Sequence, residues 1–537
     1  MLLGSMVLNR FHPEDSTVTD KRRASDPGHS LPATPQARER FIAAVTKNDN
    51  RGIRDFFRQR LDPNFQTNDE AQLYPLHIAA RNGDLTTIGL LLLHRADIGC
   101  TSRNNSTPLM AALEHGQLNS ALALIQHGPT TVVVKDNSQQ TALHIAARKN
   151  SYVVVKVLLA NGADPNAQNT SGYTPLIEAV LREDRELITH DTSVLSLLLD
   201  PEAHGLPSTK SADHTLACFK DQHTALHLAA ANGYIEDVKL LMASSESQST
   251  KSTRSCTSAG DALKRTPLWL AARNGHLDVV KLLLDFDSAS ASQNSQDPEA
   301  PSPLWALALS KLDPAAIKAG LSLLIPSVDV NARNTNNSTL LHRAAFTGDS
   351  NLTTLLLNAG SNPQIQDNIG RYPLHYAALR GHETVLSLLL TTPQPPNLPP
   401  SPPPSPPPLP SPPSPLDKFP DPNPNPHYIN HPDTQGLTPL MLAAGSPNHK
   451  PALPIIHLLT SRGATPHLRN SLGHTALYVA ASQGNILAAA YLLGKDGADL
   501  NAVDERGSTC LDVARRNMHG EMVEFLRGLG ALEGVEP

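Results

Sequence analysis

Charged and aromatic residues are scarce in this chain of 537 residues. Lys, Arg, Asp and Glu together make up 18% of the sequence, and Phe, Trp and Tyr make up 4%. With 44 basic and 50 acidic side chains, the net charge of -6 gives no overall positive field that would attract phosphate backbones or membrane surfaces. So few aromatic rings also leave little surface for stacking nucleic-acid bases. The composition therefore predicts neither a nucleic-acid partner nor a membrane partner.

Cysteines and long apolar runs are equally rare. The chain has four cysteines that lie far apart, which is typical of a reducing compartment: Cys100, Cys218, Cys256 and Cys510. No run of eighteen apolar residues occurs, and the first ten residues lack the apolar stretch and cleavage site of a secretory signal. The hydrophobic fraction of 39% is still enough for a folded core. We therefore expect a folded protein of the cytoplasm, with the nucleus as a second compartment.

What the sequence does contain is a recurring segment of seven residues. Residues 74–80 read YPLHIAA, and residues 141–147 (TALHIAA) and 224–230 (TALHLAA) follow the same pattern. With the Thr-like residue as the start, twelve repeats begin at positions 74, 107, 141, 174, 224, 266, 302, 339, 372, 438, 475 and 509, and five of the intervals are 33 or 34 residues. The third residue is Leu in all twelve repeats, and the sixth is Ala in eleven, with Leu307 as the exception.

Each position of the repeat has a structural reason. Thr at the start, as at Thr107, caps a helix with its hydroxyl, and a following Pro occupies the first helical position, where a missing N–H costs nothing. Nine residues after the start, seven repeats have a Gly that predicts a left-handed helix stop, and Asn150 takes this place in an eighth. Apolar pairs such as Leu158 and Leu159 indicate a second helix, and segments such as 162–167 (GADPNA) indicate a hairpin that leads into the next repeat.

This pattern resembles the ankyrin repeat family, whose signature is Thr-Pro-Leu-His-x-Ala at a period of 33. The resemblance covers residues 38–535 apart from insertions, and residues 41–64 resemble an amino-terminal capping repeat without the signature. It implies an all-α repeat solenoid of stacked helix-turn-helix repeats with β-hairpin loops, because one repeat cannot bury its apolar face alone. In this family the first helices line a concave groove beside the hairpins, and the groove commonly binds other proteins.

The resemblance and the composition together divide the chain into four regions. We expect a disordered tail over residues 1–36, about ten repeats over 37–391, a looped-out proline-rich insert over 392–427, and about three repeats with a cap over 428–537. Polar insertions lengthen the first block of repeats near residues 183–223, 243–262 and 285–301. We favour one continuous stack from which the insert loops out, and two separate arrays are the alternative.

Two short segments outside the repeats have candidate roles. Between Pro393 and Pro426 lie 19 of the 46 prolines, which favours polyproline II, and we interpret this segment as a spacer. Docking to an SH3-type partner is the alternative. In the tail, residues 22–27 (RRASDP) resemble a basophilic kinase site at Ser25, and phosphorylation there would create a docking motif for 14-3-3 proteins.

Two repeats depart from the pattern. Glu178 lies beside the core signature of the repeat that starts at Thr174, and Lys311 replaces the stopping Gly of the repeat that starts at Ser302. Both changes predict weaker stacking of these repeats.

The candidate protein-binding residues are positions eight and nine of the repeats and the hairpin tips. In the family these positions face the groove or lie beside it. The candidates are Arg81, Arg148, Lys149, Arg273 and Arg380 on first helices, and Asn105, Asn137, Asn169 and Asn337 in hairpins. The basic residues favour partners with acidic segments. The alternative is that they pair with neighbouring repeats.

Histidines recur at the fourth position of the repeat, at His77, His144, His227, His342 and His375. Packed helices lie about 8–10 Å apart, which is too far for zinc bonds of about 2.0–2.1 Å, and the resemblance implies hydrogen bonds within the stack instead. A zinc site formed by His214, Cys218, His223 and His227 is a further hypothesis, although two of these residues belong to repeat positions. The residues 528–534 match a dinucleotide loop only faintly and follow a predicted helix, not a strand.

The sequence contains no Walker loop, nucleophile elbow or kinase signature, so we predict no catalytic centre, cofactor or bound metal. The favoured function is a non-enzymatic scaffold or adaptor that binds partner proteins through the concave groove and the hairpin tips. One alternative is a substrate-recognition subunit of a larger enzyme complex, such as a ubiquitin ligase. A metal-dependent activity at His214 and Cys218 is the other alternative.

Overall fold

The computed structural model describes residues 34–182, 193–207, 209–247, 256–287, 300, 302–391, 426–446, 449–494 and 497–534. The described chain forms two compact units: unit 1 comprises residues 34–170 with Arg182, and unit 2 comprises residues 171–181 and 193–534. Most of the predicted tail, including Ser25, lies outside the described residues, as do most of the proline-rich insert and parts of the three polar insertions.

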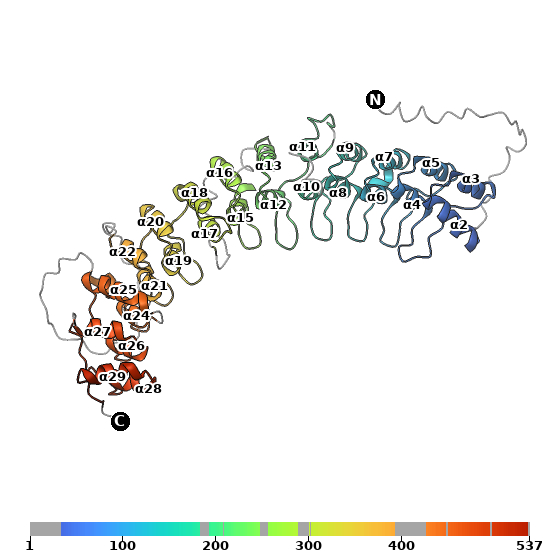
Figure 1. The fold of residues 1–537 in the computed structure, drawn as a ribbon. Helices are drawn as coiled ribbons and strands as arrows, with labels where there is room; N and C mark the ends of the chain where they lie inside the picture. The colour runs from blue at the N-terminus through green and yellow to red at the C-terminus, as the bar shows by residue number, and fades with distance from the viewer. Residues whose placement is uncertain are drawn as a thin grey trace, which may run out of the picture. The chain divides into compact units, whose positions relative to one another are not determined.

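Unit 1 consists of paired short helices. An amino-terminal pair, α2 (Pro35–Thr46) and α3 (Asn50–Arg58), precedes three repeats whose first helices are α4 (Pro75–Asn82), α6 (Pro108–Glu114) and α8 (Ala142–Arg148). Their second helices are α5 (Leu85–Leu93), α7 (Leu118–His127) and α9 (Tyr152–Ala160), and a 3-10 helix, η1 (Pro129–Val133), follows α7. First helices pack against first helices of neighbouring repeats and second helices against second helices, which gives the two layers seen in Figure 1.

Unit 2 contains nine further repeats of the same form. The first helices are α10 (Pro175–Val180), α12 (Ala225–Ala231), α15 (Pro267–Asn274), α17 (Pro303–Ala308), α19 (Leu340–Thr347), α21 (Pro373–Arg380), α24 (Pro439–Ala444), α26 (Ala476–Ser482) and α28 (Cys510–Arg516). The second helices are α11 (Ser193–Leu199), α13 (Ile235–Ser247), α16 (Leu277–Phe286), α18 (Pro314–Leu324), α20 (Ser350–Asn358), α22 (Glu383–Thr391), α25 (His449–Ser461), α27 (Ile486–Gly494) and α29 (Gly520–Gly528). Two short elements, η3 (Ile325–Ser327) and α23 (Pro426–Ile429), lie between repeats.

The helix boundaries follow the predicted chemistry. Each of the twelve predicted starts is the residue directly before a first helix. The hydroxyl oxygen of Thr107 accepts a hydrogen bond from the backbone N–H of Met110 at 3.3 Å, and Thr438 caps its helix in the same way. Gly83 ends α4 with φ at 80°, and Asn150 adopts the same left-handed region with φ at 51°. The predicted caps and stops are therefore confirmed.

The amino-terminal helix α2 begins inside the segment expected to be a disordered tail. Pro35 is its first residue, and the Thr34 hydroxyl accepts a hydrogen bond from the Ala37 N–H at 3.3 Å. This is the Thr-Pro capping chemistry of the repeats, in a repeat that lacks the rest of the signature. Its core is aromatic, because the rings of Phe41 and Phe56 stack with their centroids 3.8 Å apart.

The repeat signature forms the core between neighbouring repeats. The Leu at the third position is at most 3% exposed in all twelve repeats, and the Ala at the sixth position is at most 1% exposed. A methyl group at the sixth position lets the first helices approach closely, whereas the larger Leu fills the space beneath them. Leu307, which replaces that Ala in α17, is also fully buried.

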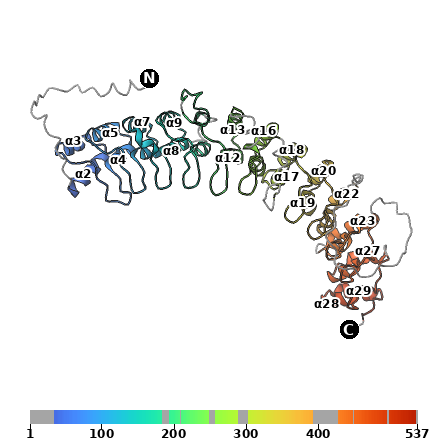
Figure 2. The same ribbon diagram turned by 180° about the vertical axis from the view of Figure 1, so that it is seen from behind.

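The loops between repeats are hairpins joined to one another at their tips. The described residues form no named strand, but the loops close with hairpin hydrogen bonds such as Asp136 N–H to the Gln140 carbonyl at 3.0 Å. One tip donates a backbone hydrogen bond to the preceding tip, as from Asn137 to Asn104 at 2.9 Å and from Thr434 to Ile369 at 2.9 Å. We call this series the tip ladder. Figures 1 and 2 show the loops of unit 1 extending from the first-helix layer, away from the second helices.

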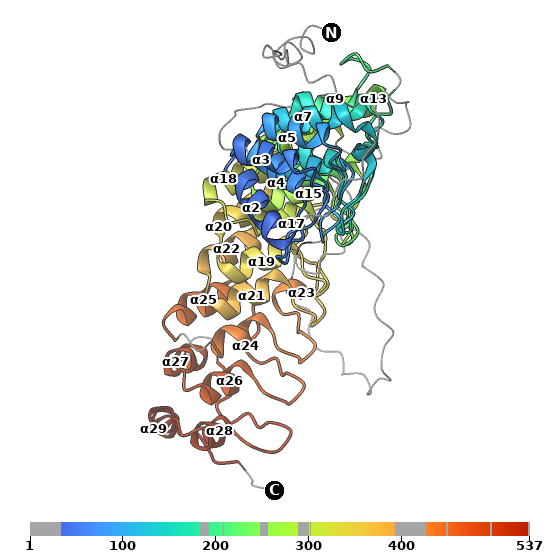
Figure 3. The ribbon, with the colours of Figure 1, turned by 90° about the vertical axis from the view of Figure 1, so that its right-hand side faces the viewer.

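In unit 2 the tip ladder and both helix layers pass across the proline-rich insert. Helix α21 packs against α24 and α22 packs against α25, although more than thirty residues of sequence separate α22 from α23. Figure 3 shows α21, α24, α26 and α28 in succession, with the loops before α26 and α28 on the same side of the helices. The helices on the two sides of the insert therefore meet as neighbouring repeats do.

The degenerate repeat that starts at Ser302 stacks unequally on its two neighbours. Helix α17 packs closely against α15 but makes only slight contact with the next first helix, α19. Second helices carry the contact there, since α18 packs against both α16 and α20. Helix α17 has six residues and ends without a left-handed stop, so it presents less surface than its neighbours. The predicted weaker stacking is confirmed on the α19 side.

Candidate protein-binding surface

The first helices place the predicted arginines on one face, and most of these arginines contact a neighbouring repeat. Arg148 on α8 forms an ion pair with Glu114 on α6 at 2.9 Å. Arg273 on α15 donates a hydrogen bond to the carbonyl of Leu309, the residue that ends α17. The Arg380 guanidinium lies 4.0 Å from the ring centroid of Phe346 on α19. Arg81 and Lys149 are half-buried on the same face of unit 1.

The predicted hairpin asparagines take part in the geometry of the tips. Asn105 and Asn337 adopt left-handed backbone conformations, with φ at 59° and 61°. The side-chain amide of Asn137 donates to the carbonyl of Arg103 in the preceding tip at 3.3 Å, and Asn169 is buried. These positions suit Asn because it tolerates the left-handed region and makes local hydrogen bonds. Their contribution to partner binding stays a prediction.

Sequence reasoning missed a carboxylate that organises many hairpins. It stands five residues before the start of a repeat, and in Asp367 one oxygen accepts hydrogen bonds from the N–H groups of Ile369 and Arg371 at 3.0 and 2.9 Å. The same position is occupied by Asp136, Asp261, Asp433 and Asp504, with Asn334 and Asn470 as amide versions. The signal that could have found it is this recurrence of Asp or Asn at a fixed distance from the Thr-like residue.

These hairpin carboxylates also join neighbouring repeats. Asp433 accepts from the guanidinium of Arg371 at 2.9 Å, and Asp261 lies 3.1 Å from the His223 ring and 2.8 Å from the Arg265 guanidinium. Burial would raise the pKa of Asp261, but hydrogen bonds from His223 and Arg265 outweigh it and hold that pKa below the usual range. The carboxylate is therefore ionised and structural at neutral pH.

The recurring histidines bridge neighbouring repeats as the resemblance implied. In His342 one ring nitrogen accepts from the Thr339 N–H at 3.1 Å, and the other lies 3.1 Å from the carbonyl of Arg371 in the next hairpin. Burial, reinforced by the charge of His223, lowers the pKa of His227 to about 4, and burial lowers the pKa of His375 to about 4 as well. These rings are neutral at physiological pH, and both nitrogens of His342 are engaged within the stack.

The hypothesis of a zinc site finds no support among the described residues. No group of three or more His, Cys, Asp or Glu side chains in the described part of the chain has the arrangement of a metal site. His223 pairs with Asp261, and His227 contacts the Arg265 carbonyl at 3.1 Å. Cys218 is buried, and its sulfur accepts a hydrogen bond from the His223 N–H.

The cysteines are placed as small core residues. All four are unpaired and buried. Burial, with a smaller effect of the Asp97 charge, raises the pKa of Cys100 to about 12, and burial raises the pKa of Cys510 to about 11. Since the thiolate is the reactive form, neither thiol is a suitable nucleophile at neutral pH.

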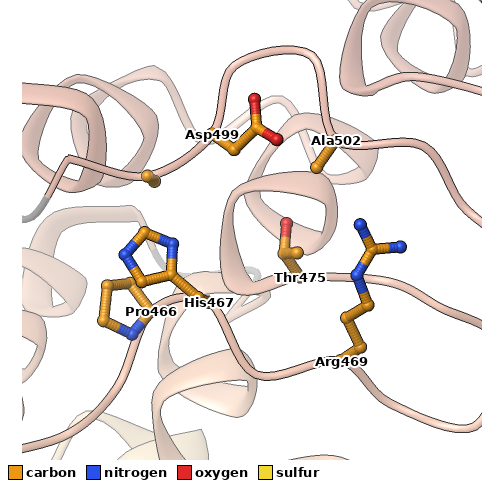
Figure 4. A pocket seen from close by; sticks show the side chains of 7 residues that line it. Pro466, His467, Arg469, Thr475, Asp499 and Ala502 are labelled. Carbon is orange, nitrogen blue, oxygen red and sulfur yellow. The ribbon is translucent and has the colours of Figure 1, made fainter. Parts of the chain in front are cut away.

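A pocket of about 230 Å³ lies between two hairpins near the carboxyl-terminal end. Figure 4 shows that Pro466, His467 and Arg469 come from the hairpin before α26, and Asp499 and Ala502 from the hairpin before α28. The Arg469 guanidinium donates to the Val503 carbonyl at 2.6 Å, so it already links the two hairpins. The volume is below the 300–1,000 Å³ typical of small-molecule sites. This space is better explained as the gap between two stacked hairpins.

Within the described residues, no helix combines the length and the apolar composition needed to cross a bilayer.

A family model described as ankyrin repeats in three copies matches most of the chain. It matches residues 41–134, 76–169, 123–204, 154–253, 190–297, 312–398 and 440–532. These ranges include both units and reach across the repeats on either side of the proline-rich insert.

Several curated proteins are similar to the chain over parts of their length. The human transient receptor potential cation channel subfamily A member 1 is 27% identical over 471 residues, which is 85% of this chain and 36% of that protein. Inversin of Canis lupus familiaris is 34% identical over 173 residues, 31% of this chain and 14% of inversin. E3 ubiquitin-protein ligase KEG of Arabidopsis thaliana is 25% identical over 310 residues, 56% of this chain and 18% of the ligase. The chain thus spans about a third or less of the length of these relatives.

Proposed function

The chain belongs to the ankyrin repeat family, and from this premise we propose that it acts as a non-enzymatic scaffold or adaptor that binds partner proteins. The proposed binding surface is the first-helix face together with the hairpin tips. The observation that supports this proposal most directly is the contrast in exposure between residue types. The signature histidines and all four cysteines are buried, whereas Arg380 on the first-helix face is exposed. The surface offers groups suited to recognition rather than to catalysis.

We further propose that the preferred partners carry acidic segments. The candidate residues on the first helices are Arg or Lys, and complementary charge speeds association and suppresses wrong partners. Where an arginine is engaged within the stack, as Arg148 is with Glu114, a partner carboxylate has to compete with an existing ion pair. Such residues contribute orientation and charge more than net affinity.

The decisive experiment is capture of partners from a native lysate on the intact chain. We expect the double variant Arg81→Glu with Arg148→Glu to recover less of each partner than the unmodified chain, because the reversed charges repel acidic segments. The matched control is Lys156→Glu on the second helix α9, which changes the same kind of charge on the opposite layer. Equal recovery by all three chains would contradict a role for the first-helix face of unit 1.

A substrate-recognition subunit of a larger enzyme complex is the second candidate. It is supported by the similarity to a protein named as an E3 ubiquitin-protein ligase, and ankyrin repeats would then select the target. The same capture experiment separates the two candidates, because recovery of ligase subunits with the chain would favour the second. Recovery of other partners without ligase subunits would favour the adaptor.

The segments outside the described residues add three further proposals. The proline-rich insert is proposed as a spacer, with an SH3-type domain as its alternative partner, and Ser25 as a phosphorylation site. A cytoplasmic location, extending to the nucleus, is supported by four cysteines that are all unpaired.

A further inference from the structure

Phe346 on α19 is exposed in a place where the other first helices present no comparable side chain. It is 42% exposed. The other large hydrophobic side chains that are exposed in the described part of the chain lie on second helices, in hairpins or in connecting turns. Burying a phenylalanine stabilises a fold, so an exposed one on a recognition face calls for a reason other than stability.

The surroundings of Phe346 hold it in a fixed aromatic and cationic arrangement. The Tyr376 ring on α21 meets it edge to face with the centroids 6.0 Å apart, and the Arg380 guanidinium lies 4.0 Å from its centroid. Tyr376 is fixed in turn, because its hydroxyl donates to the buried carboxylate of Asp367 at 2.6 Å. Arg380 itself is exposed. We call Phe346, Tyr376 and Arg380 the α19–α21 patch.

The charge around the α19–α21 patch has one sign. Seven consecutive first helices, from α12 to α26, contain no Asp or Glu, and their charged residues are Arg273, Arg343 and Arg380. In unit 1 the corresponding face carries Glu114, which pairs with Arg148. The first helices around the patch therefore favour negative charge in a ligand more than the first helices of unit 1 do.

Aromatic and arginine side chains that lie together on a firm base are typical of the residues that dominate protein interfaces. We propose that the α19–α21 patch is the docking site for an acidic segment of a partner protein. An aromatic or aliphatic side chain of that segment packs on Phe346, and a neighbouring carboxylate pairs with Arg380, assisted by the charge of Arg343. The inference rests on the proposed protein-binding function and narrows it to one site and one kind of ligand.

The test uses the full chain and phage-displayed random dodecapeptides as the probe. Selected peptides are synthesised with a fluorophore, and their affinity is measured by fluorescence anisotropy, beside versions in which Asp and Glu are replaced by Asn and Gln. We expect selected peptides to carry Asp or Glu next to an apolar residue, and the amide versions to bind at least about 10-fold more weakly.

Three variants locate the site. Phe346→Ala and Arg380→Gln should each weaken binding by about 10-fold or more, whereas Lys318→Gln on the second helix α18 should leave it unchanged. Unchanged circular dichroism and thermal midpoints show that the variants remain folded, as expected for exposed side chains. Arg380→Lys should recover only part of the affinity, because an ammonium cannot form the bidentate contact of a guanidinium.

The outcomes separate this site from the general function. Peptides that bind without acidic residues, or that bind all variants equally, overturn the α19–α21 site. If the selected peptides lose affinity with Arg81→Glu and Arg148→Glu instead, protein binding stands and this location is wrong. If no peptide is enriched, the site is overturned, and an empty capture from lysate would overturn the proposed function as well.

Discussion

At the scale of single residues, the buried histidines make the stability of the fold sensitive to acid. The pKa of His227 is lowered to about 4 in the folded chain, from about 6.5 when the chain is unfolded. Between these two values the unfolded chain binds more protons than the folded chain, so stability is fully present above pH 6.5 and is lost as the pH falls toward 4. His375 behaves in the same way, because its folded pKa is also about 4.

The His227→Gln variant tests this dependence. We expect the free energy of unfolding of the native sequence to fall between pH 6.5 and 4, with each such histidine adding about 1 kcal/mol per pH unit in the steepest part. The variant should be less stable at pH 7 but should show a smaller slope. The measurement is urea unfolding followed by circular dichroism at several pH values. His467→Gln, which changes an exposed histidine, is the control and should keep the full slope.

Residue roles were predictable from the sequence where local chemistry determines them. The Thr caps, the left-handed stops and the structural role of the signature histidines follow from the repeat itself. The engagement of Arg148 with Glu114 and of Arg380 with Phe346 could not be assigned, because it depends on which side chain the adjacent repeat presents. The exposure of Phe346 was missed for the same reason: position eight is polar or small in most repeats, and nothing in the local pattern distinguishes this one.

At the scale of the structural element, the tip ladder depends on close approach between hairpins. Gly436 has φ at +77°, and a Cβ placed there would lie 2.6 Å from the backbone nitrogen of Ser471 in the next hairpin. Gly360 has a similar φ of +84°, but a Cβ there would meet no atom within 4 Å. The two glycines therefore share the conformational strain of an added side chain and differ in the contact between hairpins.

This difference predicts the cost of two matched substitutions. Gly360→Ala should cost about 1–2 kcal/mol, the usual penalty for a left-handed alanine. Gly436→Ala should cost about 1–3 kcal/mol more, because the methyl group forces two backbones apart. Urea unfolding of both variants measures the difference. Equal costs would show that the tips separate freely and that the ladder contributes little.

Element boundaries were predictable, and the consequences of irregular repeats were predictable only in part. The helix starts follow from a Thr or Tyr, a Pro and a Leu at fixed spacing. The repeat that starts at Ser302 was expected to stack weakly, but its one-sidedness, with α17 close to α15 and distant from α19, depends on the length of α17 and could not be read from the missing Gly. The hairpin carboxylates were missed because attention to the first helices left the loop positions unaligned.

At the scale of the whole molecule, the proline-rich insert adds one period to a repeat. The repeat that starts at Tyr372 runs for 66 residues, from 372 to 438, which is 33 more than the period of 33. Helices α21 and α22 contact α24 and α25 through residues outside 393–426. The stacking of the repeats on the two sides therefore does not depend on the inserted residues.

Removal of the insert tests this independence. Replacing residues 393–426 by a single glycine restores the period and supplies the residue that Gly360 provides in the preceding repeat. We expect the thermal midpoint to stay within a few degrees of that of the native chain, measured by calorimetry, because the α21–α24 and α22–α25 contacts are kept. Loss of a cooperative transition, or a new low-temperature transition, would mean that residues 393–426 hold the two sides together.

The geometry of the tips also determines where the chain can vary in length. The donor of each rung stands four residues before the next helix in nearly every repeat, as Asn137 does before Thr141, so this edge keeps a constant spacing. The insertions after α13, α16 and α22 all follow a second helix, on the far side of the rungs. The molecule therefore has one conserved margin that keeps its repeats in register and one permissive margin, where new sequence can be acquired without disturbing that alignment.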